Sequence, residues 1–159
     1  WDALKRDDYF VDYQNLYTFC GVLSQRNLFV NAAKEMLKIG DKARAEELLD
    51  MCQECVPVEN FPLDITLLGF SNEYMVLDMI ETYYETGASE KALKLSKEFA
   101  DSLFQSSYFF LEFYDYAKRE FDACYNCISY LADLSDRYGN KEFGKELRER
   151  FNKMLDIEE

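Results

Sequence analysis

The amino-acid sequence predicts an all-α fold, a helical-repeat solenoid (an α-α superhelix) of about three helix pairs. Apolar residues recur at the helical period of about 3.6 residues along most of the chain, and strict alternation is nearly absent. Three glycines, Gly40, Gly87 and Gly139, each separate two such segments, and each is followed five positions later by a small residue. One helix pair cannot bury its apolar face alone, so a recurring helix–glycine–helix unit is typical of helices stacked in an array.

Length and composition favour a single domain over residues 1–159. Apolar residues make up 48% of the chain, with 12 tyrosines, 13 phenylalanines and one tryptophan, which is enough to form a core. Only two prolines and six glycines interrupt it, so the helices are expected to be long. The chain opens at Trp1 without a methionine, and we expect it to be a segment of a longer protein.

Residues 1–21 form an aromatic-rich lead, and residues 24–57 form the first repeat. The first helix of this repeat is expected over 24–39. Its second helix is expected to start from a cap at Asp41 and to end before Pro57. The apolar residues expected to face the core from the first helix are Leu28, Ala32, Met36 and Ile39.

Residues 58–70 form an apolar connection, and residues 71–117 form the second repeat. A connection this apolar is rarely left in water, so we expect it to fold against the domain with a helical turn of its own. Ser71 is the expected cap of the next helix, which Gly87 ends. A long second helix is expected to follow from Ser89 to the end of the repeat. The stripe expected to face the core from the first helix is Met75, Met79, Ile80 and Tyr83.

Residues 120–156 form a third repeat or a terminal cap, with helices expected over 120–138 and 141–155. The three turn glycines are 47 and 52 residues apart, so the period is not constant. Atypical end repeats are expected in solenoids.

The repeated unit resembles the tetratricopeptide repeat, a helix pair of about 34 residues. Aligned on the glycines, Ala45, Ala92 and Gly144 take the small position at which the two helices of a pair come close. The resemblance then implies that residues 58–70 and the long second helix of the middle repeat are insertions.

The composition argues against catalysis and against several classes of ligand. No histidine is present, so neither a Ser–His nor a Cys–His pair can form. The formal charge of −13 disfavours binding to nucleic acid or to an anionic lipid surface. No stretch approaches the roughly 20 apolar residues of a membrane span, and no signal peptide is found. We expect no catalytic residue, no cofactor and no membrane insertion by this segment.

Two Cys-x-x-Cys pairs are the most metal-like pattern in the chain. They are Cys52 with Cys55 and Cys124 with Cys127, and four thiolates can form a closed tetrahedral zinc site. Both pairs lie within apolar-periodic helical segments, however, and cysteine is among the most commonly buried residues. We therefore interpret them as core residues, with zinc and disulfides as the alternatives.

Six aromatic residues lie within residues 108–116, the densest aromatic run of the chain. A helix spreads them over more than one face, so some are expected to pack inward. The basic flank needed for stacking on nucleic-acid bases is nearly absent. We interpret the run as core together with an interface to parts outside this segment, and a purely internal core is the alternative.

The first helix of each pair lines the concave groove in tetratricopeptide arrays, so the resemblance assigns groove residues. Their mix of aromatic, apolar and charged side chains suits a peptide or a protein surface, and an ordinary solvated helix face is the alternative. The glutamates favour basic or neutral segments. The predicted groove residues are Asn27, Val30, Lys34, Tyr74, Leu77, Glu81, Tyr84, Glu85, Asn126 and Asp133.

Several stretches also resemble the C-terminal soluble region of a bacterial family of multi-pass membrane proteins. The N-terminal membrane domain of that family is similar to protein O-mannosyltransferases, which are lipid-linked-sugar glycosyltransferases. The stretches are LFVNAA (28–33), ENFPL (59–63), LGFSNEYMVL (68–77) and FDACYNC (121–127). None is a catalytic motif, so no catalytic residue carries over. The resemblance implies a membrane-tethered parent, with this domain soluble and on the periplasmic side.

The sequence therefore predicts a non-catalytic scaffold that binds protein or peptide, as the soluble appendage of a membrane glycosyltransferase-like protein. Its partner would be another protein or the membrane domain of the parent. The alternative is a purely structural domain that packs on its own membrane portion or on a second copy of itself, as a homodimer, without a ligand in the groove.

Overall fold

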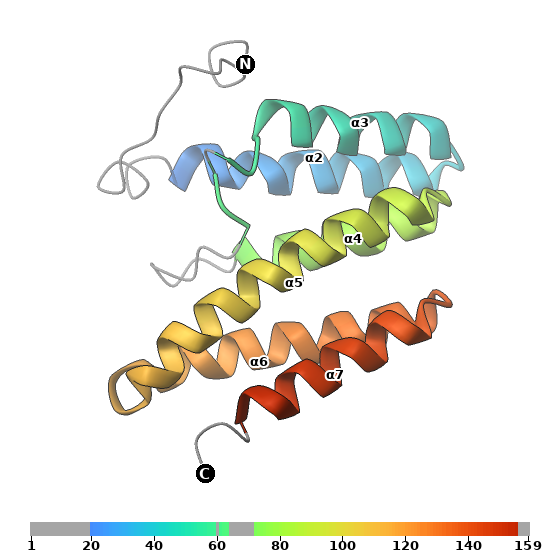
Figure 1. The fold of residues 1–159 in the computed structure, drawn as a ribbon. Helices are drawn as coiled ribbons and strands as arrows, with labels where there is room; N and C mark the ends of the chain where they lie inside the picture. The colour runs from blue at the N-terminus through green and yellow to red at the C-terminus, as the bar shows by residue number, and fades with distance from the viewer. Residues whose placement is uncertain (1–19, 60, 64–71, 156–159) are drawn as a thin grey trace. The chain divides into compact units, whose positions relative to one another are not determined.

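The structure, a computed structural model, describes residues 20–59, 61–63 and 72–155. Within these ranges the chain is all-helical and contains no strand, which confirms the predicted all-α class (Figure 1). The aromatic lead up to residue 19, most of the apolar connection and the expected cap at Ser71 lie outside the described residues. The described helices are α2 (Cys20–Lys38), α3 (Lys42–Cys55), α4 (Asn72–Thr86), α5 (Ser89–Glu112), α6 (Tyr114–Arg137) and α7 (Lys141–Leu155).

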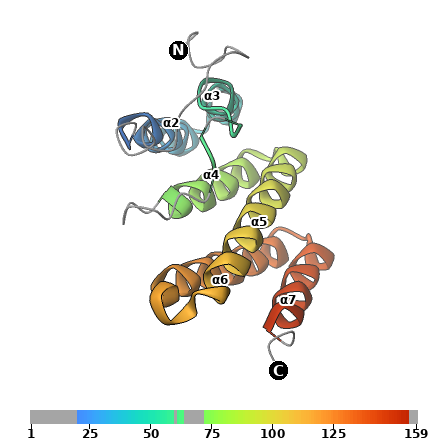
Figure 2. The ribbon, with the colours of Figure 1, turned by 60° about the vertical axis from the view of Figure 1, so that its left-hand side comes forward.

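The chain divides into two compact units, Trp1–Ala88 and Ser89–Glu159. In the first unit, α2 packs against both α3 and α4, and α3 also packs against α4. In the second unit, α5 packs against α6, α6 packs against α7, and α7 returns to touch α5 (Figures 1 and 2). The division falls just after Gly87, inside the segment that the glycine pattern assigns to one repeat.

The three glycine turns share one backbone geometry, as the sequence predicts. Gly40, Gly87 and Gly139 have positive φ angles of 84°, 101° and 89°. This left-handed conformation strains residues with a Cβ atom, and it lets the next amide reach back to an otherwise free carbonyl of the helix end. The amide–carbonyl bonds that close the turns join Asp41 to Met36 (2.9 Å), Ala88 to Tyr83 (3.1 Å) and Asn140 to Ser135 (2.8 Å).

The small residues five positions after the glycines are all buried. Ala45 and Ala92 are fully inaccessible to solvent. At Gly144 a Cβ atom would lie 2.6 Å from Asp136 Oδ1 and 2.8 Å from the backbone oxygen of Ala132, so α6 and α7 are in close contact there. The expectation of a closely packed small position is confirmed at this helix pair.

Hydrogen bonds from Arg26 of α2 hold the described part of the apolar connection against the first unit. Its guanidinium is buried and donates hydrogen bonds to the carbonyl oxygens of Pro62 (3.1 Å), Val56 (3.4 Å) and Phe61. The amide of Phe61 also donates to the carbonyl of Pro57 at 3.0 Å. Phe61 and Leu63 are buried, so this described part of the connection folds against the domain as predicted.

The predicted core face of the first helix is wrong at two of its four residues. Leu28 of α2 and Ile39, just past its end, are 61% and 73% exposed, while Ala32 and Met36 are half-buried. The buried positions among the described side chains of α2 are Arg26, Val30 and Ala33. The inner face of α2 therefore carries a long cation and small apolar residues. A buried arginine in this stripe is unexpected from periodicity alone, since it depends on carbonyl acceptors distant in sequence.

The end predicted for the long second helix is also wrong. The sequence predicts one helix from Ser89 to about residue 117, but α5 ends at Glu112 and Phe113 turns the chain directly into α6. Ala117 has non-helical backbone angles (φ −119°, ψ 21°), so the start of α6 is kinked. Neither glycine nor proline is present at this corner, and the usual local signal of a helix end is missing.

Candidate functional site

A stripe of four side chains along α4 faces solvent. Tyr74 and Glu85 are exposed, and Asp78 and Glu81 between them are half-exposed. Their spacings of four, three and four residues place them on one face of the helix. The stripe is narrow because α4 packs against both α2 and α3, and these contacts cover most of its circumference.

Polar side chains of α2 lie beside the stripe of α4. Lys34 Nζ lies 2.8 Å from Asp78 Oδ2, and both side chains remain partly open to solvent. Nearer the N-terminus of α2, the exposed side chain of Asn31 donates to Asn27 Oδ1 at 3.0 Å. The surface formed by the two helices is called the α2–α4 face and consists of Asn27, Lys34, Tyr74, Asp78, Glu81 and Glu85.

Five of the ten predicted groove residues belong to this face. The other three from the first unit do not, since Val30, Leu77 and Tyr84 are only 1%, 4% and 4% exposed. Their predicted exposure is wrong. The helical spacing that aligns Leu77 and Tyr84 with Tyr74 cannot show that neighbouring helices cover that side of α4, and the spacing within α2 likewise cannot show that Val30 is covered. Asp78 is missing from the prediction, although its position four residues after Tyr74 is a signal that could have found it.

The remaining two predicted groove residues, Asn126 and Asp133, are exposed on α6 of the second unit. Asp133 Oδ1 accepts a hydrogen bond from Arg148 of α7 at 2.8 Å, and the same guanidinium nitrogen also donates to Asp136 at 2.8 Å. These carboxylates raise the pKa of Arg148 above its ordinary value. Asp133 thus takes part in an ion pair that links α7 to α6.

The charge of the chain is concentrated in the first unit. Residues 1–88 contain 16 acidic and 7 basic residues, whereas residues 89–159 contain 15 and 11. The α2–α4 face follows this bias, with three carboxylates against the single ammonium of Lys34. A surface of this kind attracts cationic segments, and the attraction weakens as salt screens it.

The four cysteines of the two Cys-x-x-Cys pairs are buried, which confirms the interpretation as core residues. Cys52 and Cys55 lie in the first unit, and Cys124 and Cys127 lie in the second. Within the described residues none of them is in a disulfide, and no group of three or more Cys, Asp or Glu could hold a metal ion. Burial raises the pKa of the Cys52 thiol to about 12, although nearby Arg26 partly opposes this rise.

The aromatic run forms the corner between α5 and α6. Only Phe110 is buried there, and the prediction that some of these rings pack inward is confirmed for this residue alone among positions 108–116. The exposed residues, which together are called the aromatic corner, are Tyr108, Phe109, Phe113, Tyr114 and Tyr116.

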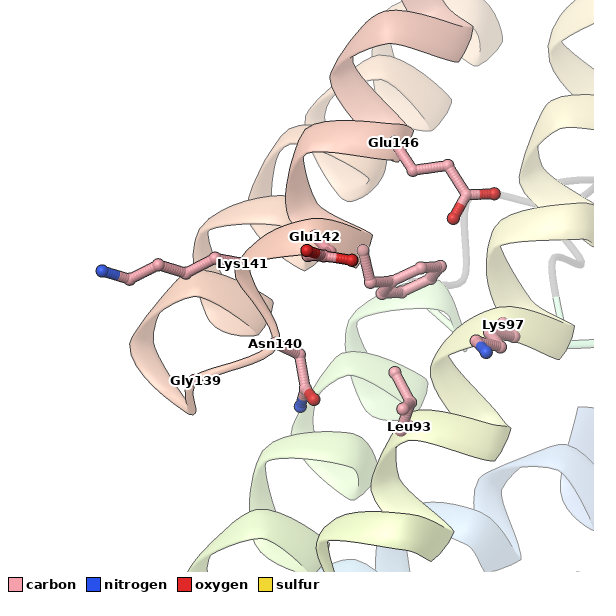
Figure 3. A pocket seen from close by; sticks show the side chains of 8 residues that line it. Leu93, Lys97, Gly139, Asn140, Lys141, Glu142 and Glu146 are labelled. Carbon is pink, nitrogen blue, oxygen red and sulfur yellow. The ribbon is translucent and has the colours of Figure 1, made fainter.

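The second unit also has an open cleft where α5 approaches the start of α7 (Figure 3). Leu93 and Lys97 line it from α5, and the Lys97 ammonium lies 6.0 Å from the ring centroid of Phe143 on α7. Glu142 and Glu146 supply carboxylates, while the side chain of Lys141 points away from α5 (Figure 3). This open, charged lining differs from the enclosed and mainly apolar setting of small-molecule sites.

Comparison with protein-family models, with curated proteins and with solved structures found no match for this chain. None of the helices that the structure describes combines the length and the apolarity that crossing a lipid bilayer requires. The resemblance to the soluble region of glycosyltransferase-like membrane proteins therefore stays a prediction.

Proposed function

We propose that this chain is a non-catalytic, tetratricopeptide-like module that binds cationic or neutral protein segments on its α2–α4 face. The observation that carries the proposal is the pairing of α2 and α4, the first helices of two successive glycine-turn units, through the Lys34–Asp78 contact of 2.8 Å. In tetratricopeptide arrays the first helices of successive pairs line the binding groove. The shared backbone geometry of the three turns supports the same relation.

The chemistry of the face supports a peptide as the ligand. Tyr74 offers a large ring with a polar tip, and such rings are favoured in contact surfaces because they add area at little cost in rotamer entropy. Glu81 and Glu85 follow on the same side of α4 and would face a cationic segment laid along the helix. The resemblance to the soluble region of glycosyltransferase-like proteins suggests a membrane-tethered parent, with this module on the periplasmic side as its appendage.

Fluorescence anisotropy with designed peptides tests the proposal. Two sets of labelled peptides of about 12 residues would share the same apolar residues and differ only in carrying several lysines or several glutamates. The lysine set should bind, and its affinity should fall between about 50 mM and about 300 mM NaCl. Equal affinity for both sets, or binding that salt leaves unchanged, would contradict the proposal.

Two variants with the same change in charge distinguish binding at the α2–α4 face from attraction to the net negative charge of the chain. Tyr74→Ala combined with Glu85→Lys should weaken binding of the lysine set at least tenfold while leaving the melting temperature unchanged, because both side chains are exposed. Glu149→Lys makes the same charge change in the second unit, at another exposed position, and should weaken binding much less. Similar losses in the two variants would show that the peptides respond only to overall acidity.

A further inference from the structure

Lys34 is the cation of α2 that reaches the acidic side of α4. The buried guanidinium of Arg26 donates to backbone carbonyls of the connection, and Lys38 Nζ lies 2.6 Å from a carboxylate oxygen of Glu35 on its own helix. Lys34 Nζ instead lies 2.8 Å from Asp78 Oδ2, across the contact between the two helices. The sequence of α4 contains no basic residue, so this ammonium is supplied to it from α2.

Asp78 occupies the middle of the stripe along which the ligand would lie. It follows Tyr74 by four residues and precedes Glu85 by seven, which places it about 6 Å and about 10.5 Å from them along the helix axis. A peptide that contacts both ends of the stripe therefore passes over Asp78. The Asp78 side chain is 50% exposed, so its carboxylate remains within reach of such a peptide while Lys34 is bound to it.

The ammonium of Lys34 has the same charge and the same donors as a lysine of the proposed ligand. A ligand lysine that approaches Asp78 therefore meets a like charge at the carboxylate that it would bind. Lys34 is part of the chain, so it forms its contact without the loss of translational freedom that a separate peptide undergoes, and its effective concentration at Asp78 is high. The two ammonium groups thus compete for one carboxylate.

The contact between Lys34 and Asp78 is weak enough to be displaced. Both side chains are partly in water, and ion pairs between such groups contribute little net stability. Lysine carries its charge on a flexible stem of four carbons, so the ammonium of Lys34 can move back into solvent without a change in the backbone of α2. Opening of this contact leaves the Asp78 carboxylate accessible to a ligand cation.

We propose that Lys34 is a built-in competitor of the cationic ligand, which occupies Asp78 in the free protein and lowers the affinity of the α2–α4 face for lysine-rich segments. This inference rests on the proposed function, because it concerns the same face and the same class of ligand. It gives Lys34 the opposite role from Tyr74 and Glu85, since removal of the Lys34 charge strengthens binding, whereas the changes at Tyr74 and Glu85 weaken it.

Lys34→Met tests the proposal with the labelled lysine peptides, in fluorescence anisotropy at about 50 mM NaCl. Methionine keeps an unbranched apolar stem and removes the ammonium, and the variant should bind these peptides about threefold to tenfold more tightly than the wild type. Lys42→Met makes the same charge change at an exposed position at the start of α3, outside the face, and should alter the affinity less than about twofold. Equal gains in the two variants, or no gain in Lys34→Met, would overturn the proposal.

Asp78→Asn, made both in the wild type and in Lys34→Met, shows whether the competition takes place at this carboxylate. In the wild type Asp78 is already paired, while in Lys34→Met it is open to the ligand. The loss of affinity caused by Asp78→Asn should therefore be at least about threefold larger in the Lys34→Met background. Equal losses in the two backgrounds would show that Lys34 acts only through its charge at a distance, which would contradict competition for Asp78.

The same assay separates a failure of this inference from a failure of the proposed function. Wild-type binding that Tyr74→Ala combined with Glu85→Lys abolishes, without any gain in Lys34→Met, would overturn the competition and leave the function in place. Lysine peptides that bind neither the wild type nor Lys34→Met would overturn both. Lys34→Gln removes the same charge with a polar side chain, and it should show the same gain if the methionine variant has a lowered melting temperature.

Discussion

Tyr83 shows how a single buried polar group joins two helices of the first unit. Its ring is fully buried, and its hydroxyl donates to Asp50 Oδ1 at 3.0 Å while accepting from Gln53 Nε2 at 2.6 Å. Burial, with Asp50 nearby, raises the pKa of Tyr83 above its ordinary range. The hydroxyl therefore stays protonated and keeps both hydrogen bonds between α3 and α4.

Removing this hydroxyl should destabilise the fold modestly. Tyr83→Phe keeps the ring and removes both hydrogen bonds, which should lower the free energy of unfolding by about 1–2 kcal/mol in urea denaturation. Tyr74→Phe is the matched control at a half-exposed tyrosine of the same helix and should change stability by less than about 0.5 kcal/mol. Equal effects would mean that the contacts of Tyr83 with Asp50 and Gln53 contribute nothing.

Cys52 makes the stability depend on alkaline pH. Burial raises its pKa from 9.0 to about 12, so above pH 9 the unfolded chain loses this proton while the folded chain keeps it. Deprotonation then favours the unfolded state, and stability falls as the pH rises. Between pH 8 and pH 10 the loss from this thiol should be roughly 1 kcal/mol. The lowered pKa of Arg26, about 10, acts mainly above this window and in the opposite direction.

The comparison of urea unfolding at pH 8 and pH 10 for the wild type and Cys52→Ala measures this contribution. The variant should be less stable at both values because it leaves a small cavity, but its further loss at pH 10 should be smaller than that of the wild type. Identical losses would contradict a protonated, buried thiol at this position.

The sequence around a residue predicts the burial of some of these side chains and not of others. The burial of Cys52, Cys55, Cys124 and Cys127 follows from apolar helical surroundings that the sequence shows directly. The burial of Tyr84 does not, because it depends on which neighbouring helices cover α4. Local spacing gives the faces of a helix, while tertiary contacts decide how many of those faces remain open.

Among the helices and turns of the fold, the glycine turns are the feature most completely predicted from sequence. Their geometry is local, since a positive φ angle and the bonds across the helix end involve only a few neighbouring residues. The corner at Phe113 and the inner face of α2 do not follow from the sequence, because their causes are not local. The corner has no glycine, and the inner face of α2 includes Arg26, whose carbonyl acceptors lie 30–36 residues away.

Substitution of a turn glycine should destabilise the fold through backbone strain. Gly87 has a φ of 101°, and a Cβ atom there would meet no other atom within 4 Å, so strain and not collision decides the effect. Gly87→Val should destabilise by roughly 1–2 kcal/mol in thermal denaturation, and Gly87→Asn by less, because asparagine tolerates the left-handed region better. A Val variant with an unchanged midpoint would contradict the turn geometry.

Substitution of Gly144 by alanine tests the close packing of α6 and α7, because the close contact reverses the sign of the expected change in stability. Glycine within a helix is less favourable than alanine by about 1 kcal/mol, so Gly144→Ala would stabilise an open position. Here the added Cβ would lie 2.8 Å from the backbone oxygen of Ala132, and the variant should instead lose about 1–3 kcal/mol. Asn152→Ala, at an exposed site of the same helix, should be neutral or slightly stabilising in the same assay. A stabilised Gly144→Ala variant would refute the close contact.

At the scale of the whole molecule, the two units differ in charge and in the kind of surface they present. The first carries most of the acidic excess and the polar α2–α4 face, and the second carries the aromatic corner. The sequence predicts the acidity and the aromatic run directly. It does not predict that the chain divides at the Gly87 turn, because the packing of α5 with α6 and α7 is a tertiary property.

Mapping a bound cationic peptide by nuclear magnetic resonance is the sharpest test of peptide binding on the α2–α4 face. The labelled 159-residue chain would be titrated with the tightest-binding lysine peptide, and amide shifts would be followed residue by residue. We predict that the largest changes lie in α2 and α4 around Lys34, Tyr74 and Glu85, and that added salt reverses them. Changes spread evenly over both units, or concentrated in residues 89–159, would show that the peptide does not bind on the α2–α4 face.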